Sequence, residues 1–348
     1  MNKFVIAFHT DTFNVRGTCV AIYDYAHYAQ IWYGVEPIII SKTGGNHSIN
    51  AIRRFRDRFP IDVYEDDLDS VLDKYNVDAV YAIVYGGHEP MIKTRRPLCV
   101  HCAFVMWNPY SDIYLGVSDW VATKPCSPQD AEFVPHMISL KPLPKHLPSS
   151  YRNGIPTKHT VFGRIGGSDV FNFGHDVISR VVRKRDDVWF LLMNVNVWDD
   201  HPRIKVINPT SNILQKQLFI AACDAMIVPE QWGHTFGISI AEFCRAGKPI
   251  LCLSATQNNN FNRQHLDELG DNAHLFHNQH EYEMLLLKNK DELSLKQSSQ
   301  AYRSYKPRPV MKEFDRLIIQ PLRALCRGRK GSRKGSVPIQ KDTTVFDL

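Results

Sequence analysis

The sequence predicts an α/β protein of two Rossmann-like domains, each built around a parallel sheet. Short apolar runs alternate with helix-like segments on both sides of a proline-rich stretch, and 348 residues are enough for two domain cores. Such alternation is typical of parallel strands joined by crossover helices. We expect a first domain at residues 1–150, a second at 151–300, a C-terminal helix at 301–326 and a basic tail at 327–348.

The first domain opens with a strand, a loop that contains Gly17 and Thr18, and a helix, as Rossmann-like domains do. The predicted strands are residues 3–8, 35–40, 61–64, 79–85 and 99–106. The predicted helices are residues 20–31, 48–58 and 67–75. The first loop lacks the Gly-x-Gly-x-x-Gly pattern, so a dinucleotide-binding interpretation is weak.

Seven prolines between residues 125 and 156 interrupt the alternation, and we expect the interdomain linker there. The strands predicted after it are residues 160–164, 188–193, 204–207, 224–228, 249–253 and 273–276. The helices predicted after it are residues 171–183, 211–222, 237–246, 264–269, 280–288 and 302–325.

Residues 227–252 organise the second domain. They predict a strand, a loop between Gly233 and Gly237, a short helix that contains Glu242, a turn at Gly247, and another strand. A loop and helix at the carboxyl end of a parallel strand is where α/β proteins bind ligands. The unpaired N–H groups of such a helix suit a diphosphate, and the Glu242 carboxylate suits a ribose diol. The alternative is that Glu242 only pairs on the helix surface.

The run from Gly233 to Glu242 resembles the signature of retaining GT-B glycosyltransferases of family 4. In that signature two glutamates stand eight positions apart around a Phe-Gly pair. Glu242 matches the second, which holds the donor ribose, whereas His234 stands where the family has the first, which contacts the donor sugar. Gly163-Arg164 after the first strand of the second domain is a further match, and Gly17 is a third.

The resemblance implies two domains that face each other across a cleft, with a nucleotide-diphosphate sugar bound between them. It assigns His101, Arg164 and His234 as catalytic residues, although His101 fits a buried core histidine equally well. It assigns the donor site to ten residues: Gly17, Thr18, Arg164, Gly166, Gly167, Ser168, Thr235, Phe236, Gly237 and Glu242. The family has a lysine a few residues after the arginine, where this chain has glycines, Ser168 and Asp169.

The expected activity is therefore transfer of a hexosyl or pentosyl group from a UDP- or GDP-sugar to a glycan or other hydroxyl acceptor. The resemblance implies retention of configuration, no essential metal and no bound cofactor. It also implies that the C-terminal helix crosses back to the first domain. Two alternatives remain open: a GT-B sugar-nucleotide epimerase, and a non-catalytic protein that binds a sugar nucleotide or a glycan.

Two short motifs suggest metals, but their context argues against a metal site. Asp67-Leu68-Asp69 lies at a predicted helix start, where acidic residues favour the helix dipole. The segment Cys99 to Cys102 lies in a predicted strand without a second Cys/His pair nearby. The eight cysteines mostly sit in apolar runs, and no window is apolar enough for a membrane span, so we expect a cytoplasmic protein.

The net charge of +6 belongs to the C-terminal part of the chain. Residues 303–334 carry +9, residues 335–348 carry −1 and residues 1–302 carry −2. The basic segment from Arg327 to Lys334 suits contact with an anionic membrane surface, unless it is a solvated terminus. It contains no aromatic residue among its charges, which argues against a platform for stacking nucleic-acid bases.

Overall fold

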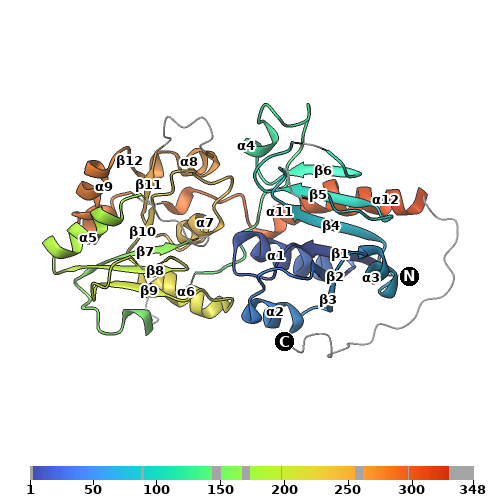
Figure 1. Cartoon of the computed structure of the whole chain (residues 1–348). Helices are drawn as coiled ribbons and strands as arrows, with labels where there is room; N and C mark the ends of the chain where they lie inside the picture. The colour runs from blue at the N-terminus through green and yellow to red at the C-terminus, as the bar shows by residue number, and fades with distance from the viewer. Residues whose placement is uncertain are drawn as a thin grey trace. The chain divides into compact units, whose positions relative to one another are not determined.

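The computed structural model describes residues 3–87, 90–107, 109–142, 150–166, 173–196, 198–254, 262–296 and 298–328. These residues form two compact units. Unit 1 contains the residues up to Met137 and those from Lys306 onward, and unit 2 is Ile138–Tyr305. Each unit holds one six-stranded sheet whose paired strands are all parallel (Figure 1). The predicted α/β class with two parallel sheets is confirmed.

Unit 1 is built on a sheet with the strand order β3-β2-β1-β4-β5-β6. Its strands are β1 (Phe4–Thr10), β2 (Val35–Lys42), β3 (Ile61–Tyr64), β4 (Ala79–Val84), β5 (Leu98–Cys102) and β6 (Ile113–Gly116). Its helices are α1 (Gly17–Tyr33), α2 (Ile49–Arg56), α3 (Leu68–Lys74), α4 (Asp119–Ala122), α11 (Pro307–Phe314) and α12 (Gln320–Gly328), with a π-helical turn (Asp315–Ile319) between the last two.

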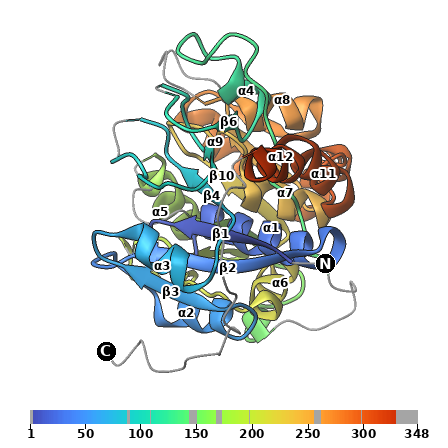
Figure 2. The ribbon, with the colours of Figure 1, turned by 90° about the vertical axis from the view of Figure 1, so that its right-hand side faces the viewer.

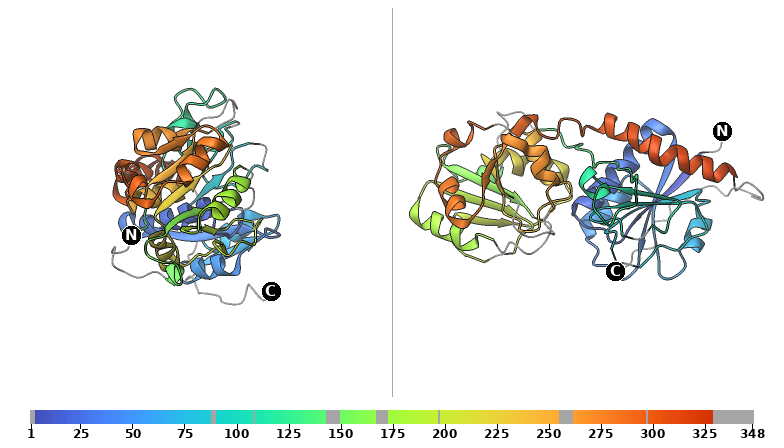
Figure 3. Two further views of the ribbon diagram at one scale, coloured as in Figure 1. Left: turned by 90° about the vertical axis from the view of Figure 1, so that its left-hand side faces the viewer. Right: turned by 90° about the horizontal axis from the view of Figure 1, so that it is seen from above.

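The C-terminal helices belong to the core of unit 1 although they lie far along the chain (Figures 2 and 3). The Phe314 ring stacks on Tyr25 of α1 at 4.6 Å and meets Tyr81 of β4 edge-on at 5.1 Å. Further along, the Arg323 guanidinium donates to the carbonyl oxygen of Tyr33 at 2.6 Å. The apolar face of the C-terminal helices therefore covers α1 and the centre of the first sheet.

Unit 2 has the strand order β12-β11-β10-β7-β8-β9. Its strands are β7 (Thr160–Ile165), β8 (Val188–Met193), β9 (Ile204–Ile207), β10 (Ala225–Val228), β11 (Ile250–Leu253) and β12 (His274–Phe276). Its helices are α5 (His175–Lys184), α6 (Ile213–Ala222), α7 (Ile238–Arg245), α8 (Gln264–Leu269), α9 (Gln279–Leu286) and α10 (Lys290–Leu293). Short 3-10 turns lie at Ser150–Arg152, Gly270–Asn272 and Ser298–Gln300.

Both sheets follow the same doubly wound plan. When the strands are numbered within each unit, each sheet has the order 3-2-1-4-5-6. Successive strands are therefore added toward one edge up to the third strand and toward the other edge from the fourth strand onward. In unit 1 this switch point lies between β1 and β4, and in unit 2 it lies between β7 and β10. Open α/β sheets bind their ligands at the carboxyl ends of the strands at such a point.

The structure departs from the predicted elements in several places, and the short helices α4 and α10 were not predicted. Strand β6, which has four residues and lies at a sheet edge, was not predicted. Strand β5 ends at Cys102, short of the predicted end at residue 106. The single helix predicted at 302–325 is interrupted by the π-helical turn between α11 and α12.

Candidate functional site

The switch point of the second sheet holds a buried ion pair. Arg164 lies near the carboxyl end of β7, and Glu230 follows the end of the neighbouring β10. Both Nε and Nη2 of Arg164 donate to Oε1 of Glu230, at 3.0 and 2.7 Å. The Arg164 side chain is 5% exposed and that of Glu230 is 20% exposed. The pair therefore bridges the two strands at the position where the topology predicts a ligand.

The charge of this pair is fixed by its surroundings. Burial alone would raise the pKa of Glu230, but the Arg164 guanidinium and the His234 side chain outweigh burial and hold the pKa well below its usual range. His175, the first residue of α5, stacks on Trp198 with ring centroids 4.0 Å apart. Burial, followed by the nearby Arg164, lowers the pKa of His175 to about 4, so this histidine is neutral at pH 7.

His234 lies beside the same carboxylate. Its Nε2 is 3.6 Å from Oε2 of Glu230, an ion-pair separation slightly longer than a hydrogen bond. Its backbone N–H donates to Nδ1 of His265 at 3.2 Å, and the two imidazole rings meet edge to face at 5.2 Å. Burial, with a smaller effect of His234, lowers the pKa of His265 to about 3. The loop that carries His234 is thus held by a neutral histidine of α8.

Gly166 follows the end of β7 at a position too crowded for a side chain. A Cβ at this position would lie 2.6 Å from the backbone oxygen of Asn194 and 3.3 Å from Nη1 of Arg164. Asn194 has a positive φ of 57° and donates from its side-chain amide to the carbonyl oxygen of Gly166 at 2.8 Å. The next two predicted donor-site residues, Gly167 and Ser168, lie outside the described residues, as does Asp169.

The loop after His234 leads into α7. Thr235 and Phe236 are buried, and the carbonyl oxygen of Phe236 accepts from the Tyr302 hydroxyl at 2.7 Å. Gly237 takes the N-cap position of α7 with φ of 84°, a left-handed conformation that glycine adopts without strain. The predicted strand, loop and helix are therefore present, and the first turn of α7 begins at the carboxyl edge of the sheet.

Glu242 is paired inside the protein. Its carboxylate lies 2.5 Å from Nζ of Lys216 on α6, and its side chain is 5% exposed. Of the two interpretations left open by the sequence, the structure shows pairing, but the pair is a buried one between two helices. A ribose diol that bound to Glu242 would have to join the Lys216 ion pair.

In unit 1, the predicted donor-site residues Gly17 and Thr18 begin α1. Gly17 is exposed, and the preceding loop is held by the Cys19 thiol, which donates to the carbonyl oxygen of Thr12 at 2.8 Å. The loop therefore presents the N-terminus of α1 at the carboxyl end of β1, beside the switch point of the first sheet.

His101 is enclosed in the core of unit 1. It is fully buried on β5, its Nδ1 lies 2.7 Å from the Tyr81 hydroxyl and its Nε2 lies 3.0 Å from the carbonyl oxygen of Gly116. Burial lowers its pKa to about 4 despite the hydrogen bond to Gly116. Because both ring nitrogens have partners inside the fold, the geometry favours the core-histidine interpretation over the catalytic one.

Solved glycosyltransferases resemble the chain over most of its length. HepE from Anabaena in complex with UDP-glucose has a TM-score of 0.68 and 14% identity, covering 91% of this chain and 99% of HepE. Sucrose-phosphate synthase from Thermosynechococcus elongatus has a TM-score of 0.64 and 9% identity, covering 92% and 100%. A glycosyltransferase from Rickettsia africae has a TM-score of 0.58 and 15% identity, covering 94% and 98%. No protein-family model and no curated protein sequence matches the chain.

The chain has the GT-B fold. The predicted resemblance is thereby confirmed at the level of fold. In this GT-B chain the predicted residues Arg164, Gly166, His234 and Gly237 gather at one edge of the second sheet.

Several residues of this edge were missed by the sequence analysis. Glu230, His175, Asn194 and His265 are single polar residues in loops or at helix starts, and no motif marks them. Glu230 had one usable signal, since it follows Pro229 immediately after a predicted strand, at the same sheet edge as Arg164. Lys216 had none, because it lies 26 residues before Glu242 on a different helix.

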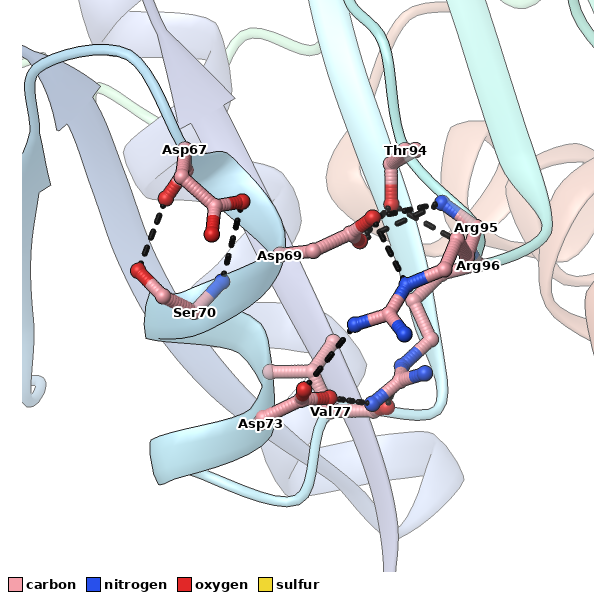
Figure 4. Close-up of polar contacts among 8 residues, drawn as sticks. All are labelled: Asp67, Asp69, Ser70, Asp73, Val77, Thr94, Arg95 and Arg96. Carbon is pink, nitrogen blue, oxygen red and sulfur yellow. Dashed lines mark hydrogen bonds and ion pairs between the residues drawn. The ribbon is translucent and has the colours of Figure 1, made fainter.

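The Asp67-Leu68-Asp69 motif is structural (Figure 4). The motif lies at a helix start, as predicted, and the Asp67 side chain accepts from the Ser70 N–H at 3.3 Å and so caps α3. Asp69 accepts from the Thr94 hydroxyl at 2.7 Å and from the Arg95 N–H at 3.0 Å, which ties α3 to the segment before β5. The two carboxylates thus serve different partners.

The remaining predictions concern thiols, metals and membranes. All eight cysteines lie in the described residues and are free thiols, six of them buried. Among the described residues there is no group of three His, Cys, Asp or Glu side chains placed to hold a metal ion, and no helix is long and apolar enough to cross a membrane. The basic segment from Arg327 to Lys334 lies outside the described residues beyond Gly328, and Arg327 itself is exposed at the end of α12.

Proposed function

We propose that this chain is a glycosyltransferase that uses a nucleotide-diphosphate sugar. The observation that carries the proposal is the Arg164–Glu230–His234 cluster, which lies at the switch point of the second sheet beside the N-terminus of α7. The fold adds support, because HepE, with the same fold, has been solved in complex with UDP and with UDP-glucose. The donor sugar nucleotide, a UDP- or GDP-sugar, is the only co-substrate that the proposal needs.

In the proposed complex, the donor diphosphate lies between Arg164 and the first turn of α7. Nη1 of Arg164 lies beside Gly166, 3.3 Å from where a Cβ on that residue would stand, while Nε and Nη2 hold Glu230. Backbone N–H groups at the start of α7 complete the anion site. These groups stabilise the charge that develops on the departing diphosphate, which is the main electrostatic contribution to the reaction.

The remaining donor contacts are assigned by position. Glu242 joins Lys216 in holding the ribose, and His234 lies near the sugar because it shares the loop with Gly237. Thr235 and Phe236 shape that loop from within the core. We also assign Gly17 and Thr18, at the start of α1, to the donor site. The acceptor is a glycan or another hydroxyl compound, and transfer occurs with retention and without an essential metal.

A second function is favoured by the charge of the site. Glu230 neutralises Arg164, His175 is neutral at pH 7, and the segment 165–172 contains no lysine. A diphosphate site with so little positive charge fits a protein that binds a sugar nucleotide without turning it over. Sugar-nucleotide binding without transfer would support this alternative.

Nucleotide binding is tested by thermal unfolding of the purified protein with UDP, GDP, ADP, CMP and UDP-glucose. A ligand that binds the native state at 100 times its Kd adds about 2.7 kcal/mol to the free energy of unfolding, so we expect one nucleoside diphosphate to raise the Tm by several degrees. Glu242→Gln should lose that increase, whereas Glu281→Gln, on the exposed surface of α9, should keep it.

The outcome separates the two functions. A Tm increase together with sugar transfer or donor hydrolysis supports the transferase. A Tm increase with an intact donor after prolonged incubation supports the binding protein. No increase with any of the five ligands would contradict both.

A further inference from the structure

The two carboxylate oxygens of Glu230 have different partners, Arg164 at Oε1 and His234 near Oε2. Both hydrogen bonds from Arg164 end on Oε1, at 3.0 and 2.7 Å. A carboxylate whose role was only to neutralise an arginine would commonly bind it through both oxygens in a bidentate pair. Here Oε2 is turned away from Arg164 and lies 3.6 Å from Nε2 of His234.

The second oxygen is buried and accepts no hydrogen bond from the described residues. A buried carboxylate oxygen without a hydrogen bond costs free energy, so the presence of one here indicates a role for Glu230 outside the ion pair. Besides Arg164 on β7 and His234 in the loop before α7, the charge of Glu230 acts on the pKa of His265 on α8, Cys252 on β11 and Tyr282 on α9. Arg164 and His234 are the two that pair with it directly.

The backbone makes this arrangement rigid. The His234 N–H donates to the Asn262 carbonyl oxygen at 2.9 Å, and Nδ1 of His265 lies 3.2 Å from the same nitrogen. Arg164 lies in the ladder of β7 with β8, and the preceding Gly163 packs so closely that a Cβ there would lie 2.2 Å from the Cys223 sulfur. The carboxylate therefore lies between two side chains whose main chains are already fixed.

We propose that Glu230 is a positioning residue that links Arg164 to His234 and sets the charge of the phosphate site. Through Oε1 it orients the guanidinium so that Nη1 lies beside Gly166, and through Oε2 it orients the imidazole of His234. It also cancels the charge of Arg164, so that the site binds a free diphosphate weakly. This assignment rests on the proposed function for its use in catalysis, but not for the geometry.

The test compares Glu230→Gln and Glu230→Asp with the parent protein by two measurements. The first is the NMR signal of the His234 ring in protein with labelled histidine, assigned with His234→Gln. The second is calorimetric binding of inorganic pyrophosphate, which carries no base or sugar. Glu230→Gln should shift the His234 signal and tighten pyrophosphate binding about five- to tenfold, because the Arg164 charge is no longer cancelled.

Glu230→Asp separates the effect of the carboxylate charge from the effect of side-chain length. It keeps the negative charge, so pyrophosphate affinity should stay near that of the parent, but its shorter side chain should still shift the His234 signal. Glu283→Gln is the matched control, since Glu283 pairs with Arg180 and Lys184 on the surface of the same unit, and it should change neither measurement. With a turned-over donor, both Glu230 variants should lower kcat more than they raise KM.

An unshifted His234 signal in Glu230→Gln, together with unchanged pyrophosphate affinity, would overturn the proposal and leave Glu230 as a structural ion-pair partner. Failure of the proposed function has a different signature. If no nucleotide binds but the His234 signal still moves, the positioning role stands and the donor assignment fails.

Discussion

Acidification below pH 6.5 is expected to destabilise the protein steeply, because four histidines are buried in the neutral form. Burial lowers the pKa of His9 and His101 to about 4 and that of His136 and His265 to about 3. A histidine of the unfolded chain binds a proton near pH 6.5, whereas these four bind one only well below that pH. The unfolded state therefore takes up more protons as the pH falls, and acid favours unfolding.

The size of the effect follows from proton linkage. Each histidine that is protonated only in the unfolded state lowers the free energy of unfolding by about 1.4 kcal/mol per pH unit. Stability should be fully present above pH 6.5 and should be lost progressively between pH 6.5 and pH 4. Urea unfolding at a series of pH values measures the slope.

A pair of variants checks the origin of that slope. His101→Gln should flatten it by about one proton, whereas His280→Gln, at an exposed position of α9, should leave it unchanged. A stability that is constant between pH 7 and pH 5 would contradict the neutral, buried state of these histidines.

Arg164→Met is expected to destabilise the protein by about 3 kcal/mol, because it removes the partner of a largely buried carboxylate. The two partners are 5% and 20% exposed, so little solvent is available to compensate Glu230. Breaking a buried pair from one side costs far more than replacing both partners together. The double variant Arg164→Met/Glu230→Gln should therefore recover much of the lost free energy, which urea unfolding at pH 7 measures.

The control for this variant is Arg180→Met. Arg180 pairs with Asp176 and Glu283, but its side chain is 44% exposed, so its loss should cost no more than about 1 kcal/mol. If the single Arg164 variant is no less stable than the Arg180 variant, or if the double variant is no more stable than the single one, the ion pair at the switch point is not buried as described.

The fold could be predicted from the sequence because its elements have local signals. Strand β7 and strand β10 are apolar runs that end at Gly163-Arg164 and Pro229, and glycine marks both ends of the α7 segment. These signals also predicted that Arg164 and Gly237 lie at the carboxyl ends of strands. Strand β6, although its sequence Ile-Tyr-Leu-Gly is apolar, was not predicted.

The contacts of the candidate site could not be predicted, because they depend on tertiary neighbours. The sequence gives no reason to pair Arg164 with Glu230, which lies 66 residues away and meets it only because β7 and β10 are adjacent. Nor does it show that Lys216 forms an ion pair with Glu242, or that Tyr81 and Gly116 are hydrogen-bond partners of the two ring nitrogens of His101. Motifs predicted the candidate residues, and topology determined their partners.

The most direct test of the donor site is hydrogen exchange, read by mass spectrometry, with and without saturating UDP, or GDP if only GDP raises the Tm. The account predicts slower exchange in unit 2 at the carboxyl ends of β7 and β10, in segments 164–166 and 230–242. Segments of β9 and α9 should exchange as in the free protein. Slower exchange confined to other parts of unit 2, with segments 164–166 and 230–242 unchanged, would contradict the placement of the nucleotide at the Arg164–Glu230–His234 cluster.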